Sequence, residues 1–273
     1  MKKIAIIFDF DETLVEESTS AFLKSLDVDV NKFWGETVQE LLAQDWDPVP
    51  AYMYKMLEYS FNDNNHTITK QSFEKFAKKI KYKSGVKELF ANLKDEIKNL
   101  DTSANIEFYI ISSGIGELIR NTVIAKEFTD IWASDFSYDK KGEIVFPKKI
   151  LSFTDKTRYI FQISKGMIGE KYRNSPYIVN EKIDENDYAI PIKNMIYIGD
   201  GLTDIPCFSL IKGYGGTPIA VYDAQNMKAY GKAWTFVKDE RVSNLHSANF
   251  TKGSDLYNTI LMAVNEMLSR NSH

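Results

Sequence analysis

Four short runs dominated by apolar residues stand out along the chain. They cover residues 4–8, 106–112, 195–199 and 218–222, and none of them alternates strictly between apolar and polar positions. Strands that are buried on both faces of a parallel sheet are continuously apolar rather than alternating. The four runs therefore predict buried parallel strands.

Amphipathic stretches separate these runs. In residues 85–97 the apolar side chains recur at helical spacing with charges between them, and residues 253–268 repeat the pattern, with Ser254 as the predicted N-cap. Strands that alternate with helices are typical of an α/β domain with a parallel sheet. The fold class that we predict is α/β, with a Rossmann-like parallel sheet as its core.

One long segment interrupts this alternation. Residues 15–84 have helical patterns and no convincing strand, so we predict an inserted, mainly helical cap there, with residues 1–14 and 85–273 forming the core. Within the core, residues 136–147 predict a hairpin around a polar turn. Residues 168–193 are polar and irregular, which indicates a long surface loop or a small insertion.

Composition and charge exclude several classes of protein. The chain has 273 residues, 44% of them hydrophobic, which is enough for one large domain or a domain with a sizeable insertion. The 34 basic and 38 acidic residues give a net charge of −4. A nucleic-acid-binding surface needs a basic excess or stripe, so we expect no nucleic-acid partner.

The location of the protein is predicted from three features. No apolar run approaches the ~18 residues of a membrane helix, and the first run ends at Asp9, too early for a signal peptide. The single cysteine, Cys207, cannot form an internal disulfide and has an apolar context, which predicts a buried thiol and fits a reducing compartment. We therefore expect a soluble cytoplasmic protein with no membrane contact.

Acidic residues follow two of the predicted strands. Asp9 and Asp11 come directly after the first run, and Asp200 and Asp204 follow the third. A single exposed aspartate is usually a turn or cap residue, but ligands of an open α/β sheet bind outside the carboxyl ends of its strands. Four carboxylates converging there would repel one another unless a cation neutralised them. Oxygen ligands of this kind suit Mg²⁺, which we predict as the cofactor.

Two further features lie near the same predicted edge. The second run ends in Ser112, Ser113 and Gly114, whose hydroxyl and backbone N–H groups could form an anion cradle, although an ordinary Ser/Gly turn has the same composition. Lys156 begins a predicted helix, where an isolated lysine is usually a solvated surface charge. The order of these features along the chain favours a joint site.

That order resembles a known family. The sequence "DFDET", then "ISSG", then Lys156, then "GDGLTD" is similar to the four motifs of the haloacid dehalogenase-like (HAD) hydrolase superfamily. The long interval between the first two motifs resembles the phosphoserine-phosphatase-like branch, whose helical cap lies there. The interval from Lys156 to Asp200 is longer than in compact members, and the segment 168–193 falls within it.

The resemblance implies a role for each matching residue. Asp9 would be the nucleophile that becomes an aspartyl-phosphate, and Asp11 the general acid and base. Asp9, Asp200 and the backbone carbonyl of Asp11 would ligate Mg²⁺, and Asp204 would support the metal or its waters. The substrate's phosphoryl oxygens would be held by Ser112 and the N–H groups of Ser113 and Gly114, and Lys156 would neutralise charge between nucleophile and phosphate.

The resemblance thus implies a Mg²⁺-dependent phosphatase, a phosphoric monoester hydrolase, acting on a small phosphorylated metabolite. A phosphotransferase on the same fold and a non-catalytic binding protein remain alternatives. The sequence does not identify the substrate, the oligomeric state or the cap residues that contact substrate. Glu16 and Glu17 lie near the position where related enzymes place such a cap residue, but they equally fit a solvated helix start.

Overall fold

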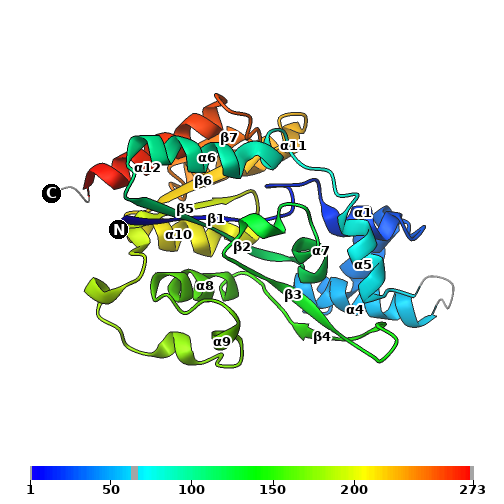
Figure 1. The fold of residues 1–273 in the computed structure, drawn as a ribbon. Helices are drawn as coiled ribbons and strands as arrows, with labels where there is room; N and C mark the ends of the chain where they lie inside the picture. The colour runs from blue at the N-terminus through cyan, green and yellow to red at the C-terminus, as the bar shows by residue number, and fades with distance from the viewer. Residues whose placement is uncertain (1, 63–66, 271–273) are drawn as a thin grey trace.

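The computed structural model describes residues 2–62 and 67–270, and its centre is a seven-stranded sheet in the order β4-β3-β2-β1-β5-β6-β7 (Figure 1). All neighbouring strands are parallel except β3 and β4, which form an antiparallel hairpin. The predicted α/β fold and the predicted hairpin are therefore confirmed. The strands are β1 (Lys2–Phe8), β2 (Ala104–Ile115), β3 (Asp130–Tyr138), β4 (Ile144–Lys149), β5 (Met195–Gly199), β6 (Thr217–Tyr222) and β7 (Asn244–Ser247).

Helices cover both faces of the sheet. In β1, Ile4, Ile6 and Phe8 join the core on one face, and Ala5 and Ile7 join the core on the other, which explains why the run is continuously apolar. The first face is covered by α6 (Val86–Leu100) and α12 (Asp255–Arg270), and α8 (Asp155–Ser164) and α10 (Ile205–Gly213) cover the second (Figure 1). Ser254 caps α12 as predicted, because its hydroxyl accepts the N–H of Tyr257 at 3.3 Å.

The helices between β1 and α6 group together beyond one end of the sheet (Figure 1). They fall where the sequence predicts the cap, whose boundaries at 14/15 and 84/85 stay a prediction. The β3–β4 hairpin lies against them, since the N–H of Lys70 donates to the carbonyl of Gly142 at 2.8 Å. These helices are α1 (Ser18–Lys24), α2 (Val30–Lys32), the π-helical η1 (Phe33–Val38), α3 (Gln39–Leu42), α4 (Pro48–Asn62) and α5 (Lys70–Ala77).

Two strands were not foreseen at their full extent. The first half of β3 carries polar residues such as Asp130 and Ser134, and β7 is a four-residue edge strand without an apolar run. The segment 168–193 is mostly exposed and forms only short helical turns.

The remaining helices are α7 (Gly116–Arg120), η2 (Ala125–Glu127), α9 (Glu170–Arg173), η3 (Ile178–Asn180), η4 (Glu185–Asp187), η5 (Ile192–Asn194), η6 (Leu202–Asp204) and α11 (Met227–Lys238).

None of the helices in the described ranges combines the length and the apolar character that a membrane crossing requires. Cys207 is buried and unpaired, as predicted from its apolar context.

Candidate active site

Asp9 and Asp200 follow the two central strands β1 and β5, which pair in parallel. The backbone N–H of Asp9 donates to the carbonyl of Ile198 at 2.8 Å, so the two strand ends lie side by side. Asp204, at the end of η6, completes a cluster in which one carboxylate oxygen from each of the three aspartates lies within 4.8 Å of the others. Carboxylate oxygens of three of the four acids therefore meet at this sheet edge.

The carboxylate of Asp11 lies outside this cluster. Its Oδ1 accepts the N–H of Ser18 at 2.7 Å, because the chain turns toward α1 after the first strand. Its Oδ2 faces Gly114, where an added Cβ would lie only 2.4 Å from it. Burial, followed by the charge of Glu17, raises the pKa of Asp11 to about 8. Asp11 thus lies outside the cluster and faces Gly114, although it is close enough to Glu17 and Asp9 for their charges to raise its pKa.

Lys156 lies at the start of α8 and is fully buried among the acids. Its Nζ is 2.7 Å from Oδ1 of Asp204 and 3.3 Å from Oδ2 of Asp9. Burial alone would lower the pKa of Lys156, but the carboxylates of Asp204 and Asp9 raise it above its usual range. Lys156, which taken alone resembles a solvated surface charge, therefore bridges two of the aspartates.

Asp204 is held on both of its oxygens. Besides Lys156, the hydroxyl of Tyr197 donates to Oδ1 at 2.7 Å, and the N–H of Gly201 donates to Oδ2 at 3.0 Å. These bonds hold the carboxylate beside Lys156 and use three of its four lone pairs, so that one on Oδ2 is left. Tyr197 was not predicted as a site residue, because its one signal in the sequence is a hydroxyl inside an otherwise apolar strand.

The chemistry of the cluster fits a divalent cation. Burial raises the pKa of Asp9 to about 6, with a further contribution from Asp204, and burial with the charges of Asp204 and Asp9 raises the pKa of Asp200 well above its ordinary value. One lysine faces three acids, so negative charge is in excess. Carboxylate oxygens are the ligands that Mg²⁺ prefers, and a cation held by Asp9 and Asp200 would offset that excess.

Ser112, Ser113 and Gly114 lie in an irregular part of β2. Ile111 pairs with Trp132 and Ile115 with Ser134, so the three residues between them bulge out of register with β3. The N–H of Gly114 donates to Oγ of Ser112 at 3.0 Å, and Oγ of Ser113 is buried without a hydrogen-bond partner in the described part of the chain. The bulge thus brings Gly114 and the hydroxyl of Ser112 close to the carboxylate of Asp11.

Tyr52 of α4 connects the helical segment to this bulge. Its hydroxyl donates to the carbonyl of Ser113 at 2.8 Å, and its ring lies 5.7 Å from that of Trp34. Two other aromatic residues of this segment, Trp46 and Tyr54, are exposed and pack on each other. Glu17 caps α1, accepting the N–H of Ser20 at 2.7 Å, and so has a structural partner of its own.

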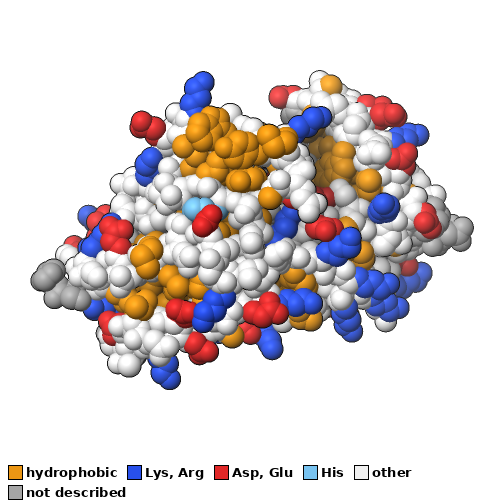
Figure 2. All heavy atoms as spheres, turned by 90° about the horizontal axis from the view of Figure 1, so that it is seen from above, with side chains coloured by type: hydrophobic (Ala, Val, Ile, Leu, Met, Phe, Trp, Pro, Cys, Tyr) orange, Lys and Arg blue, Asp and Glu red, His pale blue; other side chains and the backbone are white. Residues whose placement is uncertain are grey.

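The junction between the two parts of the chain is hollowed and charged. Seen from above, the surface is indented between the part that holds the sheet and the helices of residues 15–84 (Figure 2). Residues of both parts, among them Glu16, Lys83 and Asp223, line a depression of about 360 Å³. Lys83 lies 2.9 Å from Glu12 and 3.3 Å from Asp223, so ion pairs tie the connecting segment to the core.

Comparison with known proteins agrees with this geometry. Residues 4–214 match the model of the family described as "Putative Phosphatase", which is more than half of the chain. The chain belongs to this family. It is accordingly a HAD-like phosphatase, a phosphoric monoester hydrolase.

The individual proteins that resemble this chain have low sequence identity to it. A protein of Borreliella burgdorferi (strain ATCC 35210 / DSM 4680 / CIP 102532 / B31), described as uncharacterized, is 29% identical over 94% of this chain and 95% of its own length. A probable phosphoserine phosphatase from Vibrio cholerae is similar in structure, with a TM-score of 0.61 and 12% identity over 98% of this chain and 67% of that one. A phosphoserine phosphatase solved as a phospho-aspartyl intermediate analogue has a TM-score of 0.56 and 17% identity over 96% and 99% of the chains. The solved structures show a shared phosphoserine-phosphatase-like fold.

Proposed function

We propose that the protein is a Mg²⁺-dependent phosphatase that hydrolyses a small phosphorylated metabolite through an aspartyl-phosphate on Asp9. The observation that carries the proposal is the buried bridge from Lys156 to Asp9 and Asp204, next to Asp200. A nucleophilic carboxylate needs nearby positive charge to approach a phosphate dianion, and Lys156 lies 3.3 Å from Asp9. A phosphoserine phosphatase of similar fold, solved as a phospho-aspartyl intermediate analogue, supports this chemistry.

The reaction has two steps in this proposal. An oxygen of Asp9 bonds to phosphorus while the ester P–O bond breaks, and the departing alkoxide takes the proton of the Asp11 carboxyl group. Water then attacks phosphorus, Asp11 accepts its proton, and the bond to Asp9 breaks to release inorganic phosphate. The position of Asp11 beside Gly114, away from the three-acid cluster, supports its role as the group that handles the proton.

The other residues hold the reacting groups. Asp9, Asp200 and the backbone carbonyl of Asp11 would hold Mg²⁺, which would supply positive charge for the phosphoryl oxygens when bound. Asp204 would act indirectly, because its oxygens already bond to Lys156, Tyr197 and Gly201. Ser112 and the N–H of Ser113 would contact the phosphoryl oxygens. In this structure the N–H of Gly114 donates to Ser112, so Gly114 would contribute chiefly by leaving room for Asp11.

We further propose that residues 15–84 act as a lid that limits the size of the leaving group. The hydrogen bond from Tyr52 to the carbonyl of Ser113 supports contact between this segment and the phosphate cradle. A covered site excludes bulk water and favours small metabolites over phosphoproteins. The cytoplasmic location and the absence of a nucleic-acid partner stay predictions.

Turnover of an aryl phosphate tests the proposed function. We expect Asp9→Asn to abolish phosphate release in Mg²⁺ while circular dichroism stays unchanged, and excess EDTA to abolish it in the unmodified protein. Asp95→Asn, an exposed aspartate on α6, is the matched control and should keep full activity. Substantial turnover by pure Asp9→Asn protein would remove Asp9 from the nucleophile's role, and full activity in EDTA would overturn the metal requirement. Transfer of phosphate to an added alcohol in place of release would favour a phosphotransferase.

A further inference from the structure

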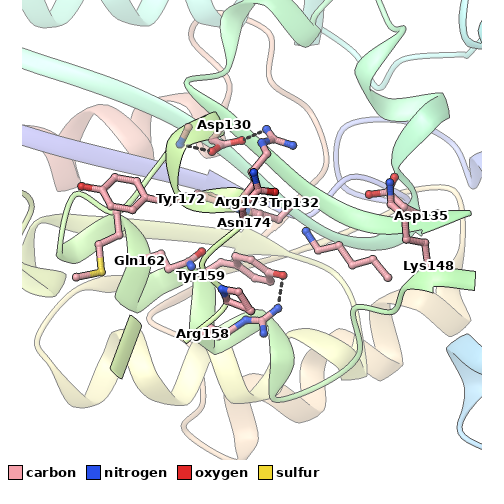
Figure 3. Close-up of a pocket in the computed structure, with 14 residues that line it drawn as sticks. Asp130, Trp132, Asp135, Lys148, Arg158, Tyr159, Gln162, Tyr172, Arg173 and Asn174 are labelled. Carbon is pink, nitrogen blue, oxygen red and sulfur yellow. Dashed lines mark hydrogen bonds and ion pairs between the residues drawn. The ribbon is translucent and has the colours of Figure 1, made fainter. Parts of the chain in front are cut away.

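A second cavity lies along the edge of β3, beside α8 (Figure 3). Its volume is about 540 Å³, within the range of small-molecule sites. Asp130 and Arg173 are on one side of it, Arg158 and Tyr159 are on the opposite side, and Lys148 of β4 lies near Asp135 (Figure 3). None of the proposed catalytic or metal-binding residues lines this cavity.

Positive charge predominates on its walls. Four basic side chains line the cavity, against two acidic ones, in a chain whose net charge is −4. Both acids already have basic partners, because Asp130 accepts Arg173 at 2.7 Å and Asp135 is ion-paired with Arg120. In the described parts of the chain, Lys148, Lys149 and Arg158 have no carboxylate within ion-pair distance. The cavity therefore holds cations that the protein itself does not neutralise.

Two of these cations are held in place by one aromatic ring. Nζ of Lys149 lies 5.0 Å and the guanidinium carbon of Arg158 lies 4.7 Å from the centre of the Tyr159 ring, which also stacks on Trp132 at 5.0 Å. Nε of Arg158 is buried and has no hydrogen-bond partner within the described ranges. Burial lowers the pKa of Lys149 to about 8; the charge of Asp135 opposes this shift, and three nearby arginines add to it. The ring attracts both cations, but a buried donor without an acceptor is costly, and the two like charges repel each other. An anionic ligand would compensate both costs.

We propose that this cavity binds a small polyanion that carries a phosphate group, at a site separate from the active site. Arg158 and Lys149 would contact the anionic group, because a guanidinium and an ammonium both bind phosphate oxygens strongly. A free inorganic phosphate would leave most of the volume empty. The remainder of the ligand would lie against the aromatic walls formed by Trp132 and Tyr172.

Binding of pyrophosphate in excess EDTA tests this proposal. We would titrate the full-length protein by calorimetry and by tryptophan fluorescence, since Trp132 lines the cavity. We expect saturable binding that Asp9→Asn leaves unchanged and that Lys149→Met and Arg158→Gln each weaken at least tenfold. Lys141→Met is the matched control, because it removes the same charge from the exposed β3–β4 turn and should bind as the unmodified protein does. Trp132→Phe should keep the calorimetric binding and lose the fluorescence change.

Three results would overturn the proposal: no saturable binding of pyrophosphate, equal binding by the Lys149→Met and Arg158→Gln variants, or binding of citrate with no binding of pyrophosphate. Turnover of an aryl phosphate by Lys149→Met shows that this variant is folded, and it should stay near the unmodified rate. If Arg158→Gln does not fold, Lys149→Met decides the outcome alone. Failure of the proposed phosphatase would be seen separately, as no turnover of the aryl phosphate by the unmodified protein or as substantial turnover by Asp9→Asn.

Discussion

Replacing Lys156 by methionine tests whether the buried bridge organises the site. The change keeps most of the side-chain volume and removes the cation that lies 2.7 Å from Asp204 and 3.3 Å from Asp9. At an effective dielectric constant of about 20, each of these attractions is worth about 5–6 kcal/mol, and the desolvation of three buried charges offsets most of it. The measurable effect is the cost of leaving buried carboxylates without their cation, about 3–5 kcal/mol.

Urea denaturation in EDTA measures this cost. Because the pKa of Lys156 is raised, its stabilising effect is fully present at pH 7 and would be lost only as the pH rises through that elevated pKa. The loss in Lys156→Met should shrink toward pH 5, because Asp9, with a pKa of about 6, is then protonated and needs no partner. The denaturant slope should stay unchanged, and Lys141→Met should alter the free energy of unfolding by less than about 0.5 kcal/mol. A loss below about 1 kcal/mol at pH 7, or one independent of pH, would refute the reasoning.

Three further variants test other contacts. Gly114→Ala places a Cβ 2.4 Å from Oδ2 of Asp11, so we expect turnover of an aryl phosphate to fall by about a hundredfold with an unchanged circular dichroism spectrum. Tyr52→Phe removes the hydroxyl that donates to the Ser113 carbonyl, and urea denaturation should show a loss of about 1 kcal/mol. Lys149→Met should be more stable than the unmodified protein at pH 7, because the lowered pKa means that the charged form opposes folding, and the difference should vanish as the pH rises from about 8 to 10.5.

Each of these variants has a contrary result. Gly213→Ala is the control for Gly114→Ala, since its Cβ would meet no atom within 4 Å. If the two variants turn over the aryl phosphate at the same rate, a clash between the new Cβ and Asp11 does not limit turnover. Unchanged stability in Tyr52→Phe would mean that another donor replaces the hydroxyl. A constant stability difference for Lys149→Met between pH 7 and 10.5 would show that its ammonium group is not destabilised in the folded protein.

The sheet and the acids were predictable because both depend on local sequence. A continuously apolar run indicates a strand buried on both faces, and Asp9 and Asp200 follow such runs directly. β7 was not predictable, because a short edge strand needs no apolar run. The bonds from Tyr197 to Asp204 and from Tyr52 to Ser113 were also not predictable. Tyr197 resembles any other core aromatic residue of its strand, and Tyr52 is 61 positions away from Ser113 in the chain.

The three-acid cluster shows a second limit of sequence reasoning. Four aspartates come after strands that end at the same edge of the sheet. The carboxylate of Asp11 accepts a hydrogen bond from Ser18 and faces Gly114. The carboxylate of Asp204 instead accepts hydrogen bonds from Tyr197, Gly201 and Lys156. The spacing of acids along a chain indicates that they are near one another. It does not indicate which oxygens keep free lone pairs, because that depends on donors brought in by the tertiary fold.

The central claim, that Asp9 carries the phosphoryl group during turnover, is tested most directly by trapping the intermediate. The protein would be mixed with an aryl phosphate and Mg²⁺, quenched in acid within one turnover, digested, and mapped by mass spectrometry. We expect one added phosphoryl group on the peptide that contains Asp9, which is lost on mild alkaline treatment and absent from Asp9→Asn. An adduct on another residue, or steady turnover with no adduct at any quench time, would contradict the account.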